Sequence, residues 1–180
     1  HNIPFEWIYD GNQEDISDKV LKSLFKKPFL ESSPEVSCCY KHYLAWKSFL
    51  STDKTYALIL EDDVFLAPDF VAKFNRSLSE LSQYKDTVSI QYSNAENLYT
   101  PLSRRKKDQT LYPNVKSRAA DAYLLTRASA ALRCAFIQEH GFTLPADGQC
   151  DYMDPKLEIQ FLWFEPSIVQ QGTQSGFFSS

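Results

Sequence analysis

The segment that most constrains this chain is the apolar run at residues 56–60, which leads directly into Glu61, Asp62 and Asp63. A short, uninterrupted apolar run bounded by charged residues is typical of a strand buried on both faces, as in a parallel sheet covered by helices. In open α/β sheets, ligands bind at the carboxyl ends of the strands. The sequence therefore predicts a core strand that delivers three carboxylates to a candidate site.

Other strands and helices are expected to alternate along the chain. Strand patterns cover residues 5–9, 87–92, 121–126 and 158–164, and helical patterns cover residues 18–25, 34–50, 68–81 and 127–138. Ser33 and Pro34 mark one helix start, because a hydroxyl caps the helix and proline favours its first position. Alternating strands and helices predict an α/β fold. With no repeat or linker, residues 1–180 are expected to form a single domain.

Composition excludes some classes of function. Of the 180 residues, 43% are hydrophobic and 23% are charged, which is typical of a soluble globular chain, and the net charge is −4. An acidic chain is not expected to have nucleic acid as its main partner. No apolar run reaches the roughly 18 residues of a membrane span. The start, His1-Asn2-Ile3-Pro4, has neither an initiator Met nor a signal-peptide pattern, so we interpret the chain as truncated there.

The four cysteines lack the spacing of a metal site or a redox pair. They are Cys38, Cys39, Cys134 and Cys150. Zinc sites usually contain CxxC pairs or Cys/His clusters, and no such pair or cluster here has zinc-like spacing in the sequence. We predict reduced, partly buried thiols in a cytoplasmic protein; the alternative is a lumenal protein with one disulfide.

The three acids after the apolar run favour a cation. Adjacent carboxylates raise one another's pKa unless a positive charge joins them. Oxygen ligands suit a hard divalent cation such as Mg²⁺ or Mn²⁺. Strand alternation directs Glu61 and Asp63 to one side and Asp62 to the other, so we expect Glu61 and Asp63 to face the metal. The alternative is a polar strand end whose acids cap the next turn.

Five segments, in order, resemble the motifs of glycosyltransferase family 25, which includes bacterial lipooligosaccharide and collagen galactosyltransferases. They are residues 35–42, 57–64, 120–126, 144–147 and 165–170. The resemblance implies a GT-A-like α/β fold with a mixed, mostly parallel sheet flanked by helices. The family begins with a nucleotide-binding strand to which no segment here corresponds, so this first strand is expected to be absent from the chain.

The resemblance also implies an activity, which is inverting transfer of a hexose from a UDP-sugar to a hydroxyl of a glycan or lipid-linked oligosaccharide in lipopolysaccharide biosynthesis. At the family level, the hexose is galactose or glucose. Mn²⁺ or Mg²⁺ held by Glu61 and Asp63 would act as a Lewis acid on the diphosphate. Asp62, His42 and Gln170 are expected to contact the donor. The implied location is the cytoplasm, with possible peripheral membrane contact, or the endoplasmic reticulum lumen in a eukaryote.

The match at residues 144–147 makes Asp147 the expected catalytic base, which takes the proton of the acceptor hydroxyl. The alternative is that Asp147 caps a short helix beginning at Gly148. Asp121 and Asp151 are weaker candidates for the base. His42 is alternatively a hydrogen-bonded packing residue, and Gln170 and its neighbour Gln171 are alternatively surface residues.

Two other functions stay open. A metal-dependent phosphodiesterase could use the same carboxylates, but two-metal sites usually add histidines, and those here, at positions 1, 42 and 140, show no pairing. A degenerate transferase domain could bind a sugar or a partner protein without catalysis. The basic segment at residues 103–108 is interpreted as a solvated loop, or alternatively as a flap over an anionic donor.

Overall fold

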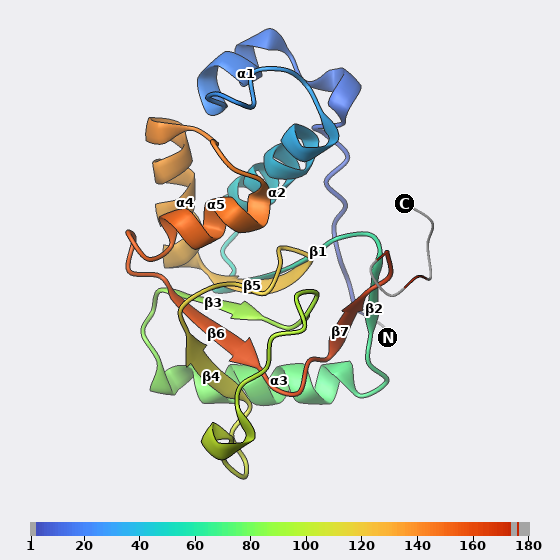
Figure 1. Cartoon of the computed structure of the whole chain (residues 1–180), viewed down its shortest axis with the longest axis vertical. Helices are drawn as coiled ribbons and strands as arrows, with labels where there is room; N and C mark the ends of the chain where they lie inside the picture. Colours follow the sequence, from blue (N-terminus) through green and yellow to red (C-terminus); the bar gives the residue numbers. More distant parts are fainter. Residues whose placement is uncertain (1–2, 174–175, 177–180) are drawn as a thin grey trace.

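The computed structural model describes residues 3–173 and residue 176. In this part of the chain, five strands form one sheet in the order β1-β5-β3-β6-β4. The strands are β1 (Tyr56–Leu60), β3 (Val88–Gln91), β4 (Leu111–Asn114), β5 (Ala122–Thr126) and β6 (Gln160–Phe164). Beside them, β2 (Val64–Leu66) pairs with β7 (Val169–Gln171) in a short ribbon (Figure 1).

Helices cover both faces of the sheet, which confirms the predicted α/β class (Figure 1). One side carries α1 (Asp18–Leu24), α2 (Pro34–Leu50), α4 (Arg127–His140) and α5 (Ala146–Met153), and the other carries α3 (Phe70–Glu80). Short 3₁₀ helices are η1 (Gln13–Asp15), η2 (Leu81–Gln83) and η3 (Leu102–Arg104). None of the helices in the described part combines the length and apolar character needed to cross a bilayer.

The sheet is mixed, but the expectation that it is mostly parallel is wrong. Among the described strands, β3 and β6 pair in parallel, whereas β1 with β5, β3 with β5, and β4 with β6 pair antiparallel. Moreover, β1 is an edge strand. Its side chains still pack on both faces, with Ala57 and Ile59 against the core under α2 and Leu58 and Leu60 against the core over α3. That two-sided packing explains the uninterrupted apolar run without parallel neighbours.

Strands β1, β3 and β6 nevertheless point in the same direction, because β5 runs in reverse between β1 and β3. Their carboxyl ends therefore lie at the edge of the sheet where β5 begins. This edge receives Glu61 after β1, Ser93 after β3 and Glu165 after β6, together with Asp121 just before β5. In open α/β sheets, ligands bind at the carboxyl ends of the strands, so this edge of the sheet is still the predicted place of a candidate site.

Most predicted elements occur close to their expected bounds. The start of α2 is as predicted, since Ser33 Oγ accepts a hydrogen bond from the Val36 amide at 3.2 Å. The strand predicted at residues 5–9 is wrong: no strand forms there, and the exposed aromatic rings of Phe5, Trp7 and Tyr9 contact one another. Alternation alone does not make a strand when no sheet edge pairs with it.

Candidate functional site

Glu61, Asp62 and Asp63 form the turn that joins β1 to β2. The Glu61 amide donates to the Asp121 carbonyl at 2.8 Å, and the Asp63 carbonyl accepts from the Gly172 amide at 2.7 Å. The backbone is thereby fixed to both sheets. Glu61 and Asp63 are half-buried, whereas Asp62 is exposed. Two of the three acids are thus held against the protein and the middle one faces solvent.

The Asp63 carboxylate has one engaged oxygen and one without a partner. Its Oδ2 accepts from the Thr173 amide at 3.1 Å and from Thr173 Oγ1 at 2.5 Å. Its Oδ1 is buried and has no hydrogen-bond partner in the described part of the chain. A buried polar atom without a partner is costly and calls for a ligand such as an ion. Asp63 Oδ1 is therefore available to a water molecule or a cation.

Asp121 brings a further carboxylate to the acidic turn. Its Oδ1 accepts from Ser93 Oγ at 2.6 Å, while its buried Oδ2 has no partner among residues 3–173 and 176. Burial raises the pKa of Asp121, and the charges of Glu61 and Asp63 raise it further, against the lowering effect of Ser93. A cation here would relieve that repulsion. The sequence predicts Asp121 only as a weaker candidate for the base, although its place at the start of the predicted strand at residues 121–126 is the signal that could have located it.

Glu61 is held by α2 and β7. Its Oε1 lies 3.4 Å from His42 Nε2 and 3.8 Å from Cys38 Sγ, and its Oε2 accepts from Gln171 Nε2 at 3.4 Å. Burial alone would lower the pKa of His42, but Cys38 and Glu61 more than offset it, and the pKa is raised to about 9. At neutral pH, a protonated imidazole therefore pairs with the Glu61 carboxylate.

A buried row of hydrogen bonds fixes the His42 ring. Its Nδ1 lies 2.9 Å from the hydroxyl of Tyr123, which also accepts from Trp46 Nε1 at 2.8 Å. Only 6% of His42 is exposed, so the ring is part of the core beneath the acidic turn. This geometry supports the packing interpretation, with His42 orienting Glu61.

The remaining sequence candidates lie apart from these contacts. Gln170 is exposed on β7 opposite Phe65, whereas alternation turns its neighbour Gln171 toward Glu61. Asp147 is exposed in the first turn of α5, which begins at Ala146, and its Oδ1 accepts from the Gly148 amide at 2.7 Å. The short helix of the alternative interpretation therefore exists, but it begins two residues earlier, and Asp147 does not cap it because Pro145 holds the N-cap position.

A buried charge cluster around Glu165 secures the long segment that leads to Asp121. Glu165 Oε1 accepts from the Thr100 amide at 2.8 Å and from Arg118 Nη1 at 3.3 Å, and Oε2 accepts from Arg105 Nη2 at 3.0 Å. Arg118 and Glu165 are almost completely buried. Burial lowers the pKa of Arg118 to about 10 although Glu165 opposes this, so the guanidinium stays charged at neutral pH.

Glu165→Gln is expected to lower the free energy of unfolding by about 1.5–3 kcal/mol, because two arginines lose the negative charge of their hydrogen-bond acceptor. Urea unfolding at pH 7 measures the change. The matched control is Glu96→Gln, which removes the charge of a partly exposed pair with Lys116 and should cost less than about 1 kcal/mol. Equal losses in the two variants would contradict the anchoring role of Glu165.

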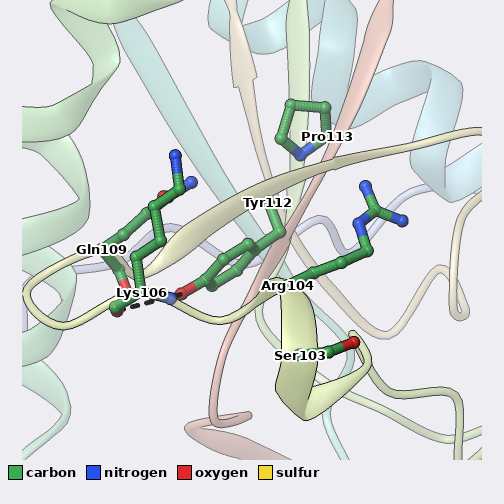
Figure 2. A pocket seen from close by; sticks show the side chains of 6 residues that line it. All are labelled: Ser103, Arg104, Lys106, Gln109, Tyr112 and Pro113. Atoms are coloured by element: carbon green, nitrogen blue, oxygen red, sulfur yellow. Dashed lines mark hydrogen bonds between the residues drawn. The ribbon is translucent and has the colours of Figure 1, made fainter.

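The basic segment at residues 103–108 lies away from the acidic turn. It lies below α3 in the view of Figure 1, whereas the acidic turn lies on the upper right of the sheet. A hollow of about 350 Å³ is lined there by Arg104, Lys106 and Tyr112, among others. Figure 2 shows the Tyr112 hydroxyl directed at the backbone of Lys106, whose amide donates to it at 3.0 Å. This arrangement does not favour a flap over a donor bound at the acids.

Comparison with known families gives one match. The model of the family described as glycosyltransferase family 25 (LPS biosynthesis protein) matches residues 1–145. This range contains the acidic turn, Cys38, His42 and Asp121, and it ends just before Asp147. No curated protein matches the chain.

Proposed function

Because the chain belongs to glycosyltransferase family 25, we propose that it is a metal-dependent, inverting glycosyltransferase that moves a hexose from a UDP-sugar to a glycan hydroxyl. The observation that carries this proposal is the pair of buried carboxylate oxygens without partners, Asp63 Oδ1 and Asp121 Oδ2, at the carboxyl end of β1. They fit a cation that is itself bound by a diphosphate. Galactose or glucose is the proposed hexose, as the family resemblance implies.

The oxygen donors suit Mn²⁺ or Mg²⁺. Glu61 and Asp63 are the proposed ligands, and we propose that Asp121 Oδ2 joins them. Such a cation supplies Lewis-acid stabilisation of the departing diphosphate. Asp62 and Gln170 are both exposed and are proposed to contact the donor from solvent-facing positions. We propose that His42 acts through Glu61, since it is buried against that carboxylate.

In the proposed reaction, Asp147 takes the proton of the acceptor hydroxyl, whose oxygen attacks the anomeric carbon from the face opposite UDP. The new glycosidic bond forms as the bond to the UDP oxygen breaks, and the configuration inverts. The exposure of Asp147 supports this role, because an acceptor arriving from solvent can reach it. The proposed acceptor is a lipopolysaccharide glycan or another lipid-linked oligosaccharide, and peripheral contact with a membrane stays a prediction.

Titration calorimetry of UDP with and without Mn²⁺ tests the donor site. We expect binding to require Mn²⁺ and to weaken by about 100-fold or more in Asp63→Ala, because one charged metal ligand is lost. The control is Asp53→Ala, which changes an exposed acid that pairs with Lys54 before β1 and should bind UDP like the wild type. If the affinity for UDP changed neither on removal of Mn²⁺ nor in Asp63→Ala, the proposed metal site would be refuted. A folded protein with no UDP binding would instead favour a degenerate domain.

A further inference from the structure

Cys38, His42 and Glu61 form a compact group of three potential metal ligands. In the described part of the chain, the Cys38 sulfur, a His42 ring nitrogen and a Glu61 carboxylate oxygen all lie within 4.8 Å of one another. Cys38 and His42 are four residues apart on α2, so both side chains project from one face of the helix. Glu61 approaches that face from the end of β1.

Two of the three distances within the group are close to those of a tetrahedral zinc site. Zinc bonds of about 2.0–2.1 Å to nitrogen and oxygen and about 2.3 Å to sulfur place these ligand atoms about 3.4–3.6 Å apart. The nitrogen of His42 lies 3.4 Å from Glu61 Oε1, and the sulfur of Cys38 lies 3.8 Å from the same oxygen. A cation could therefore enter with only small side-chain movements.

The surroundings of His42 match those of a metal-bound imidazole. Such a ring usually binds the metal with one nitrogen and donates its other N–H to a fixed acceptor. Here Nε2 faces Glu61, and Nδ1 faces the Tyr123 hydroxyl oxygen, which the Trp46 indole also holds in place. Cys38 is half-buried, which leaves a route from solvent to the group.

We propose that Cys38, His42 and Glu61 bind a thiophilic divalent cation of the zinc class, at a site distinct from the all-oxygen donor site. A sulfur and an imidazole ligand favour Zn²⁺ over Mg²⁺. Three protein ligands leave a fourth position for water. The Cys38 thiol and the protonated His42 ring each lose one proton to solvent when their bonds to the cation form, so Nε2 binds as part of a neutral imidazole.

The two sites share Glu61. If the proposed function holds, a zinc-class cation draws Glu61 toward α2 and away from the donor cation, so that Zn²⁺ and Mn²⁺-dependent UDP binding oppose each other. This coupling rests on the proposed function. The zinc-class site itself rests only on the geometry of Cys38, His42 and Glu61.

Cobalt substitution tests the site without nucleotide. Co²⁺ added to the reduced, metal-free protein is expected to give a thiolate-to-cobalt charge-transfer band and the intense visible bands of tetrahedral coordination. Zn²⁺ should displace it at one equivalent. Cys38→Ser should abolish the charge-transfer band and weaken Zn²⁺ binding by about 100-fold or more, and Tyr123→Phe should weaken it by about 10–100-fold, as losses around metal sites do.

Controls separate this site from the donor site and from unfolding. Cys134→Ser changes a buried thiol outside the group and should keep the band, and so should Asp63→Ala, even if that variant loses UDP binding. Circular dichroism confirms that each variant is folded. A folded wild type without the charge-transfer band, or a band that persists in Cys38→Ser, would overturn the proposal whatever the outcome of the UDP titration.

Discussion

Arg133→Ala is expected to lower the free energy of unfolding by about 3–5 kcal/mol, the largest effect on stability that we predict. Arg133 Nε donates to Asp154 Oδ1 at 2.9 Å and Nη2 donates to Oδ2 at 2.5 Å, and both side chains are at most 1% exposed. The guanidinium also lies over the rings of Trp46 and Tyr123. Its removal leaves the Asp154 carboxylate buried without its partner. Guanidinium chloride unfolding at pH 7 measures the loss.

A double variant separates the effect of the buried charges from the effect of side-chain packing. Arg133→Met with Asp154→Leu removes both charges, and we expect it to regain much of the lost free energy, because no charge is left buried without a partner. Lys73→Ala breaks the exposed pair with Asp69 and should cost less than about 1 kcal/mol. Arg133 lies on α4 and Asp154 is the C-cap of α5. If Arg133→Ala cost no more than Lys73→Ala, the buried pair would not stabilise the contact between these two helices.

Asp147→Asn is expected to reduce the rate of sugar transfer by about 10²–10⁴-fold, which is the usual contribution of a general base. The amide has nearly the same shape as the carboxylate but cannot take a proton. Because Asp147 is exposed on α5 and is not a proposed ligand of the cation, UDP binding should stay close to that of the wild type. Turnover of UDP-galactose and UDP-glucose, compared with UDP titration, measures the two effects separately.

Asp151 provides the matched control on the same helix. Its Oδ1 accepts from the Ser117 amide at 2.7 Å, and the amide oxygen of Asp151→Asn can replace that interaction. We therefore expect Asp151→Asn to transfer sugar at nearly the wild-type rate. A full rate in Asp147→Asn would remove Asp147 from the mechanism.

Asp121→Asn should weaken Mn²⁺-dependent UDP binding as well as the rate of sugar transfer, because Asp121 lies beside Glu61 and Asp63.

The helices and core strands could be predicted because their signals are local. Ser33 and Pro34 start α2, and the apolar run at residues 56–60 makes a strand in any sheet that covers it on both faces. The direction of its neighbour is not a local property. Whether β1 meets a parallel or an antiparallel strand depends on how β5, some sixty residues later, enters the sheet. Strands β2, β4 and β7 have only three or four residues each, too few for a periodic pattern.

The acids of the candidate site could be predicted from their position after β1, but their partners could not. The contacts of Glu61 come from α2 and β7, and those of Asp63 come from Thr173. Asp121 joins them because β5 runs antiparallel to β1, which brings its first residues beside the end of β1. Only the sheet order reveals these neighbours. The grouping of Cys38 with Glu61 likewise depends on how α2 crosses the sheet.

The position of β6 between β3 and β4 has a consequence for synthesis on the ribosome. Strands β1, β3 and β5 can pair with one another before β6 has been synthesised. Strand β4 is synthesised before β6, which is its only partner among the described strands, so it stays unpaired until β6 follows. Such distant pairings slow folding and leave strand edges open in the nascent chain. The partner of β2, which is β7, is made later still. Most of the sheet can therefore be in place before the acidic turn gains its last contacts, so the proposed binding of metal and donor should be among the final properties that a newly made molecule acquires.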